Sequence, residues 1–172
     1  MEFTEKTIVL VGGASGLGES VARRVLSEGA RLLLVGRDAD KLEGTKSSIC
    51  SRGNNERVSF LATDVTASQS ENALRSAAKA LGAQVDGLVF SIGSGRPLNG
   101  SRSSRLRESL ELHAISAAHC IDAFDGMFSE SGSVVLISSI AAHELVGAPA
   151  EYAASKGTLE ILAKNWSVEL AP

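Results

Sequence analysis

Several residue types that mark other classes of protein are scarce in this 172-residue sequence, which has two cysteines, one tryptophan and one tyrosine. Cys50 and Cys120 cannot form a disulfide framework, and neither has the spacing of a metal ligand. Residues 1–6 contain two acids before a short apolar run, so we do not expect a signal peptide. These features predict a reducing, cytoplasmic compartment.

An excess of basic charge is also missing, because 17 basic residues face 20 acidic ones and the net charge is -3. Nucleic-acid binders displace phosphate counterions with surplus Lys and Arg, so no nucleic-acid partner is expected. No apolar run approaches the roughly 20 residues of a membrane helix, so no membrane partner is expected either. Hydrophobic residues make up 44% of the chain, which excludes intrinsic disorder and indicates a globular protein.

What the sequence does contain is a regular alternation of short apolar runs and segments with helical spacing of apolar residues. The expected strands are Lys6–Gly12, Arg31–Gly36, Arg57–Thr63, Asp86–Ser91 and Ser133–Ser139. The expected helices are Leu17–Glu28, Leu42–Cys50 capped by Asp38, Ala67–Leu81, Ser104–Phe124 and Ala150–Leu170. Strands that are apolar on both faces fit a parallel sheet between two helix layers. The sequence therefore predicts an α/β fold with a doubly wound Rossmann-type sheet, as a single NAD(P)-binding domain over residues 1–172.

A glycine-rich loop, Gly-Gly-Ala-Ser-Gly-Leu-Gly at residues 12–18, joins the first expected strand to the first expected helix. Glycine lets the backbone turn sharply and approach a ligand, and a helix N-terminus offers free N–H groups to a phosphate. Any tight turn can use glycines, but this one lies in the first strand–helix unit of an alternating chain. It predicts a dinucleotide site whose candidate contacts are Gly12, Ser15, Gly16, Leu17 and Gly18. The spacing is Gly-x-x-x-Gly-x-Gly rather than Gly-x-Gly-x-x-Gly.

The end of the second expected strand indicates which dinucleotide is preferred. An acidic residue there binds a ribose 2′-hydroxyl, whereas an arginine pairs with a 2′-phosphate. The chain has Arg37 at this point, followed by Asp38, which we interpret as a helix cap. The alternative for Arg37 is an ordinary exposed arginine. As a phosphate ligand it favours NADP, in the form NADPH, over NAD.

A tyrosine and a lysine lie four residues apart at the start of the last expected helix. Tyr152 and Lys156 share one face of that helix, so the phenol and the ammonium can converge. A cation close to a phenol favours the phenolate, which suits proton exchange with a carbonyl or an alcohol. The pair alone is common by chance, and it gains meaning from the dinucleotide loop and the strand that ends in Ser138-Ser139.

Taken together and in order, these motifs resemble the short-chain dehydrogenase/reductase family over residues 6–172. The residues that carry the resemblance are the loop at 12–18, Asp64-Val65, Ser138-Ser139 and Tyr152-Ala-Ala-Ser-Lys156. It implies that Asp64 and Val65 border the adenine, and that Ser91 and Gly93 after the fourth strand also contact the cofactor.

The same resemblance implies an NADP-dependent oxidoreductase acting on a small-molecule carbonyl or secondary alcohol. Ser139 would polarise the substrate oxygen, Tyr152 would act as the acid/base, and Lys156 would hold the nicotinamide ribose. A hydride would pass between the nicotinamide and the substrate carbon. Neighbouring strand residues point to opposite faces, so only one of Ser138 and Ser139 should face the site.

Three positions depart from the family pattern. Val11 stands where a threonine usually precedes the first glycine, and Ser91-Ile92-Gly93 replaces Asn-Ala-Gly. His113 stands where the family has an asparagine that helps a proton-relay water reach the lysine. His113 is a candidate catalytic residue as a substitute relay, and the alternative is a satisfied structural histidine. The Gly/Ser/Arg-rich segment 93–104 is either a solvated connection or a loop that contacts substrate or a partner.

Two rivals to the enzyme remain: a dinucleotide-binding sensor or interaction module with little turnover, and an incomplete fragment of such an enzyme. In the family, further strands follow the last helix, and helices pair across a two-fold axis, which implies a homodimer or homotetramer. The fifth strand would here be a sheet edge without Pro, Lys or inward charge. We therefore expect the natural protein to continue past Pro172, or another chain to cover this edge.

Overall fold

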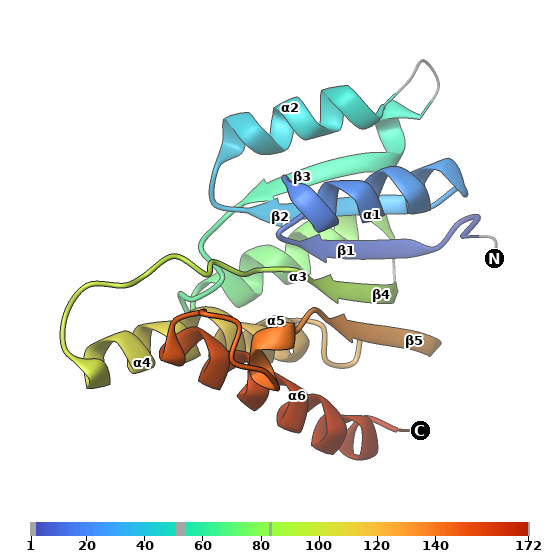
Figure 1. The fold of residues 1–172 in the computed structure, drawn as a ribbon. Helices are drawn as coiled ribbons and strands as arrows, with labels where there is room; N and C mark the ends of the chain where they lie inside the picture. The colour runs from blue at the N-terminus through green and yellow to red at the C-terminus, as the bar shows by residue number, and fades with distance from the viewer. Residues whose placement is uncertain (1–2, 51–53, 83, 172) are drawn as a thin grey trace.

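The computed structural model describes residues 3–50, 54–82 and 84–171. Its five strands form one parallel sheet in the order β3-β2-β1-β4-β5 (Figure 1). The strands are β1 Thr7–Val11, β2 Arg31–Gly36, β3 Val58–Ala62, β4 Val85–Phe90 and β5 Phe128–Leu136. The predicted α/β fold of Rossmann type is confirmed, with β5 at the predicted sheet edge. The strand order reverses between β1 and β4, the point at which ligands bind at the carboxyl ends of open parallel sheets.

Helices cover both faces of the sheet. They are α1 Gly16–Ser27, α2 Ala39–Ile49, α3 Ser70–Leu81, α4 Arg102–Leu110, α5 Ser116–Ala123 and α6 Ala150–Glu169, with short 3₁₀ turns at Asn55–Arg57 and Ile140–Ala142. Alternate residues of β1 divide the core: Ile8 and Leu10 pack with α1 and α2, whereas Val9 and Val11 pack with α3, α5 and α6. This is the two-sided burial expected for central parallel strands.

Two predicted elements differ from the structure. The expected helix over residues 104–124 is interrupted by a π-helical turn, Glu111–Ile115, which separates α4 from α5. Such turns insert a residue into a helix and are frequent at functional sites. The fifth strand begins at Phe128 and ends at Leu136, so Ser138 and Ser139 follow it instead of belonging to it. Strand alternation therefore does not set their orientation.

The capping role predicted for Asp38 is confirmed, because its carboxylate accepts a hydrogen bond of 3.1 Å from the Lys41 N–H at the start of α2. Both cysteines are free thiols, as predicted, and burial raises the pKa of Cys120 to about 12. Among the described residues, no helix is both long and apolar enough to cross a bilayer. Residues 1 and 2 lie outside the described part, so the expectation for the N-terminus stays a prediction.

Candidate active site

The glycine loop packs tightly against the carboxyl end of β4. Gly12 has φ +87°, and a Cβ at this position would lie 2.9 Å from the backbone of Ser91. A Cβ on Gly18 would lie 2.2 Å from the carbonyl oxygen of Gly12, a distance that no side chain tolerates. The loop therefore needs glycine at both positions to bring α1 against β1 and β4.

The N-terminus of α1 is exposed where the loop enters it. Ser15 is the N-cap residue, and its hydroxyl makes no capping hydrogen bond within the described residues. Gly16 has open space around its Cβ position, and the side chain of Leu17 is exposed. The first N–H groups of a helix have no partner within the helix and can bind a phosphate. The loop thus fits the pyrophosphate of a dinucleotide.

Two charged candidates lie at the neighbouring ends of β2 and β3. Asp64 accepts hydrogen bonds from the N–H of Thr66 at 3.0 Å and from its hydroxyl at 2.8 Å. These bonds, together with the charge of Arg37, hold the pKa of the Asp64 carboxyl below its usual value. Arg37 is exposed, and Val65 is buried in the core under β1. The two charges therefore flank the edge where the adenosine end of a dinucleotide would lie.

The side chains of Tyr152 and Lys156 both approach Gly93, which lies shortly after the end of β4. A Cβ on Gly93 would lie 3.6 Å from Lys156 Nζ and 4.0 Å from Tyr152 Oη. Lys156 is only 2% exposed, and its ammonium donates to the carbonyl oxygens of Ile92 at 3.0 Å and Ile137 at 2.8 Å. Burial lowers the pKa of Lys156 to about 8. The predicted convergence of the phenol and the ammonium is present.

The two serines after β5 have different partners. Ser138 donates from its hydroxyl to the backbone carbonyl of Lys156 at 3.3 Å and so faces α6. Ser139 accepts a hydrogen bond of 3.2 Å from the N–H of Ala141 and caps the 3₁₀ turn that follows. An accepting hydroxyl keeps its own proton for donation to another group. Ser139 can therefore still donate to a substrate oxygen.

His113 lies in the π-helical turn and is fully buried. Its Nδ1 is 2.8 Å from Ser155 Oγ and 3.3 Å from Ser109 Oγ, and its Nε2 accepts from the N–H of Ser94 at 3.4 Å. Burial and the charge of Lys156 lower the pKa of His113 to about 4. These three serines were not predicted from the sequence, although Ser109 precedes His113 by one helical turn and Ser155 lies inside the Tyr-x-x-x-Lys motif.

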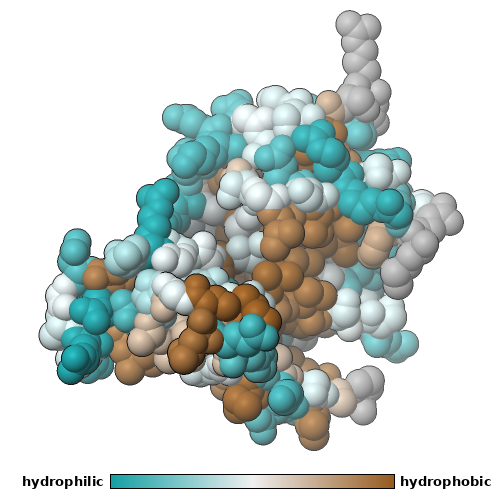
Figure 2. All heavy atoms as spheres, viewed as in Figure 1, coloured by the Kyte–Doolittle hydropathy of each residue, from teal (hydrophilic) through white to brown (hydrophobic). Residues whose placement is uncertain are grey.

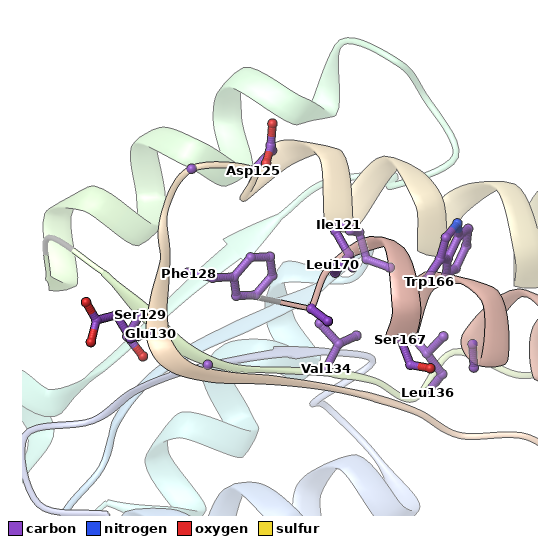
Figure 3. A pocket seen from close by; sticks show the side chains of 14 residues that line it. Ile121, Asp125, Phe128, Ser129, Glu130, Val134, Leu136, Trp166, Ser167 and Leu170 are labelled. Carbon is purple, nitrogen blue, oxygen red and sulfur yellow. The ribbon is translucent and has the colours of Figure 1, made fainter.

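A cavity of about 620 Å³ lies elsewhere, between β5 and the C-terminal part of α6 (Figure 3). Phe128 and Val134 line it from β5, Trp166 lines it from α6, and Leu170 lines it from the C-cap of that helix. Trp166 follows Tyr152 by fourteen residues on one helix, which is about 21 Å at 1.5 Å per residue. This cavity is therefore not part of the site around Gly93.

A sequence model described as "short chain dehydrogenase" matches residues 6–172. The chain belongs to this family. The levodione reductase of Leifsonia aquatica is 26% identical over 97% of this chain and 64% of its own length. The L-fucose dehydrogenase of Oryctolagus cuniculus is 30% identical over 97% of this chain and 58% of its own length.

The solved structures of short-chain dehydrogenases have the same fold. The L-sorbose reductase of Gluconobacter frateurii, complexed with NADPH and L-sorbose, superposes with a TM-score of 0.89 at 23% identity and covers 99% of this chain. A short-chain dehydrogenase/reductase of Mycobacterium ulcerans gives 0.88 at 26% identity. The chain spans 66% and 64% of the lengths of these two proteins.

Proposed function

We propose that this chain binds NADPH and carries the reacting groups of an oxidoreductase for small-molecule carbonyls or secondary alcohols. The observation that supports it most is the meeting of the Lys156 ammonium and the Tyr152 hydroxyl around Gly93. Gly93 follows the strand against which the glycine loop packs, so a dinucleotide on that loop would reach this point. The 1–172 chain is proposed to act as one dinucleotide-binding domain.

Each of three side chains has a separate task in this proposal. Tyr152 gives its phenolic proton to the substrate oxygen during reduction and takes it back during oxidation. Lys156 lies beside that phenol as a cation, and a nearby positive charge stabilises the phenolate left after transfer. Ser139 donates its hydroxyl proton to the same oxygen and stabilises charge that develops there. NADPH, when bound, supplies the hydride.

The ammonium of Lys156 has a further role in holding the cofactor. It has three N–H donors, of which two are donated to the carbonyls of Ile92 and Ile137. The third is proposed to bind the nicotinamide ribose. Ser91 and Gly93 border the same space, since the glycine loop touches Ser91 and Lys156 touches Gly93.

Arg37 is proposed to select NADPH over NADH. Its guanidinium stands exposed after β2, near Asp64, where it can pair with a 2′-phosphate. Asp64 and Val65 are proposed to border the adenine. A charge-assisted pair contributes about 1.5–3 kcal/mol, so Arg37→Gln should weaken NADPH binding about tenfold or more and leave NADH binding unchanged. Arg24→Gln, which removes an exposed arginine from α1, is the matched control.

The experiment that tests the function combines cofactor titration with turnover. NADPH binding is followed by its fluorescence, and turnover by its oxidation with a panel of aldehydes, ketones and α-diketones. Tyr152→Phe should bind NADPH like the parent and lose about 10²–10⁴-fold in kcat, because only the proton donor is gone. NADPH binding without turnover of any carbonyl would favour one of the two rivals, a dinucleotide-binding sensor or interaction module, or an incomplete fragment of such an enzyme. A phenylalanine variant as fast as the parent would refute the assignment of the acid.

Self-association is proposed to use α6. The side chains of Ile161 and Val168 on this helix and of Leu170 directly after it are exposed, and apolar residues gather over α6 and the segment before it in the lower half of Figure 2. Exposed apolar patches of this kind mark contact surfaces. A homodimer or homotetramer in light scattering is the expected result, and a monomer at working concentration would refute it.

A further inference from the structure

We propose that His113 is a positioning residue that, as a neutral imidazole, holds the Gly93–Ser94 turn against Tyr152 and takes no part in proton transfer. This inference rests on the proposed function, since it concerns the placement of the proposed acid. It differs from both alternatives left open by the sequence, a relay and a structural histidine. It adds a third role that neither alternative contains.

The hydrogen bonds of His113 fix which ring nitrogen carries the proton. A backbone N–H can only donate, so Nε2 must accept from Ser94, and the ring proton lies on Nδ1. Nδ1 therefore donates to Ser155 Oγ at 2.8 Å, and the Ser155 hydroxyl donates to the carbonyl of Tyr152 at 2.8 Å. Ser109 donates to Ser155 at 3.0 Å and completes the set. Every partner is satisfied by the neutral ring.

Protonation of His113 would break this arrangement. A proton on Nε2 would face the N–H of Ser94, which is also a donor. The charge of the Lys156 ammonium also opposes protonation, because this lysine lies on α6, which packs against the π-helical turn. The other titratable neighbour is Tyr152, whose ring meets the imidazole edge to face at 5.4 Å between centroids. Because Nε2 is occupied by a backbone N–H, which releases no proton, the ring has no proton source at that nitrogen from which to supply Lys156.

The turn around Gly93 is held at one point on each side. The Ile92 carbonyl before it accepts from Lys156 Nζ at 3.0 Å, and the Ser94 N–H after it donates to His113 Nε2 at 3.4 Å. Gly93 itself is exposed, with Tyr152 Oη 4.0 Å from its Cβ position. Most of the surrounding segment from 93 to 101 is exposed and has no regular structure. Loss of His113 would remove the second of these two contacts and leave that of Lys156.

The two ends of the imidazole can be tested separately with side chains of different length. The amide group of asparagine is attached to Cγ, as Nδ1 is, whereas that of glutamine lies one bond further out, toward the position of Nε2. Asparagine is therefore expected to replace the contact to Ser155, and glutamine the contact to Ser94. Leucine fills the space and reaches neither through a polar atom. Ser155→Ala removes the opposite partner of the ring and leaves Ser94 attached. His143→Gln, which changes an exposed histidine, is the control.

The first measurement is NMR of the ¹⁵N-labelled protein, which has three histidines. We expect the His113 ring to show the neutral Nδ1–H form from pH 8 down to pH 5.5. We expect the Ser94 amide resonance to move in His113→Asn and His113→Leu and to stay in place in His113→Gln. A His113 ring that becomes cationic near pH 6.5, or a Ser94 amide that does not respond to His113→Asn, would overturn the proposal.

The second measurement is turnover with NADPH and an α-diketone. His113→Asn should lower kcat about tenfold with KM for NADPH within twofold, and His113→Gln should restore kcat to within about threefold of the parent. A purely structural histidine would lower the midpoint of thermal unfolding without this split between Asn and Gln, and that result would overturn the proposal. If the parent chain does not turn over, the proposed function fails while the NMR result still decides the role of His113.

Discussion

β1 and β5 belong to one parallel sheet and are separated by β4, yet they differ sharply in sequence and in burial. All five residues of β1 are buried, whereas five of the nine residues of β5 are exposed. β1 pairs with β2 and β4 and has helices on both faces, while β5 pairs only with β4 in the described part of the chain. In Figure 1, β5 lies at the open end of the sheet with α6 on one side of it.

Part of the difference lies in the sequence, because residues 129–133 of β5 are Ser, Glu, Ser, Gly and Ser. The rest lies in the neighbours, because in the described part of the chain β5 has a paired strand on one side alone. Next to β1, the glycine loop packs against the backbone at the end of β4, and the candidate dinucleotide site lies at this loop. On the β5 side, an apolar cavity and an edge strand stay open. An open edge is where another strand can pair. The expectation that a further segment or a second chain covers this edge stays a prediction.

The largest loss of stability is expected in the glycine loop, which has no space for a side chain at Gly18. Gly18→Ala would place a Cβ against the carbonyl of Gly12, 2.2 Å away, and neither is the end of a flexible side chain. We expect a loss of about 3 kcal/mol or more in the free energy of unfolding, together with loss of NADPH binding. Urea denaturation and cofactor fluorescence measure both.

The matched control is Gly44→Ala in α2, where the Cβ would meet open space. Alanine in an exposed helix position should raise stability by about 0.4–1 kcal/mol. If Gly18→Ala were as stable as Gly44→Ala, the tight contact between α1 and the loop would not exist in solution. A lower free energy of unfolding for Gly18→Ala and a higher one for Gly44→Ala would support the tight contact between α1 and the loop.

A second comparison uses the same substitution in the two strands. Val9→Ala in β1 removes a side chain with 0% exposure, while Val135→Ala in β5 removes one with 46% exposure. The first should cost about 2 kcal/mol, because two buried methyl groups are lost and a cavity remains. The second should change stability by less than about 0.5 kcal/mol. A similar cost for both would mean that β5 is covered in solution, for example by a second chain.

Much of this fold was readable from the sequence because its signals are local. The apolar runs predicted the five strands, and Asp38, just before α2, was predicted to be the N-cap of that helix. The break at residues 111–115 was not predicted, since a π-helical turn keeps nearly the same apolar spacing as a continuous helix. The end of β5 was also misplaced, because Ile137 and the serines after it continue the apolar and small-residue pattern of the strand.

For the candidate site, the Tyr152–Lys156 pair was predicted from the sequence, and the partners of His113 were not. Tyr152 and Lys156 are four residues apart on one helix, so their convergence follows from helical geometry. The partners of His113 come from three separate segments, and only the tertiary fold brings Ser94, Ser109 and Ser155 to one ring. Sequence spacing could suggest Ser109 but carries no information on Ser94.

The last comparison concerns how the end of β5 is joined to the end of β4. Lys156 donates to Ile92 after β4 and to Ile137 after β5, so a buried cation joins the two strand ends. Its pKa of about 8 in the folded protein is below the unfolded value of 10.5. Between these values the unfolded chain binds more protons, so stability should rise with pH. The lysine therefore opposes folding at pH 7, and this penalty fades as pH rises from 8 toward 10.5.

The expected slope is at most about 1.4 kcal/mol per pH unit, and it should disappear in Lys156→Met. That variant also removes the hydrogen-bond donor from two carbonyls, which changes its absolute stability. The measured quantity is therefore the pH dependence of the free energy of unfolding. Lys164→Met, at an exposed position of the same helix, should keep the slope of the parent. Chemical denaturation at pH 7, 8, 9 and 10 gives the three curves. A parent curve parallel to that of Lys156→Met would mean that Lys156 is solvated, and that β5 is held by its backbone pairing with β4 alone.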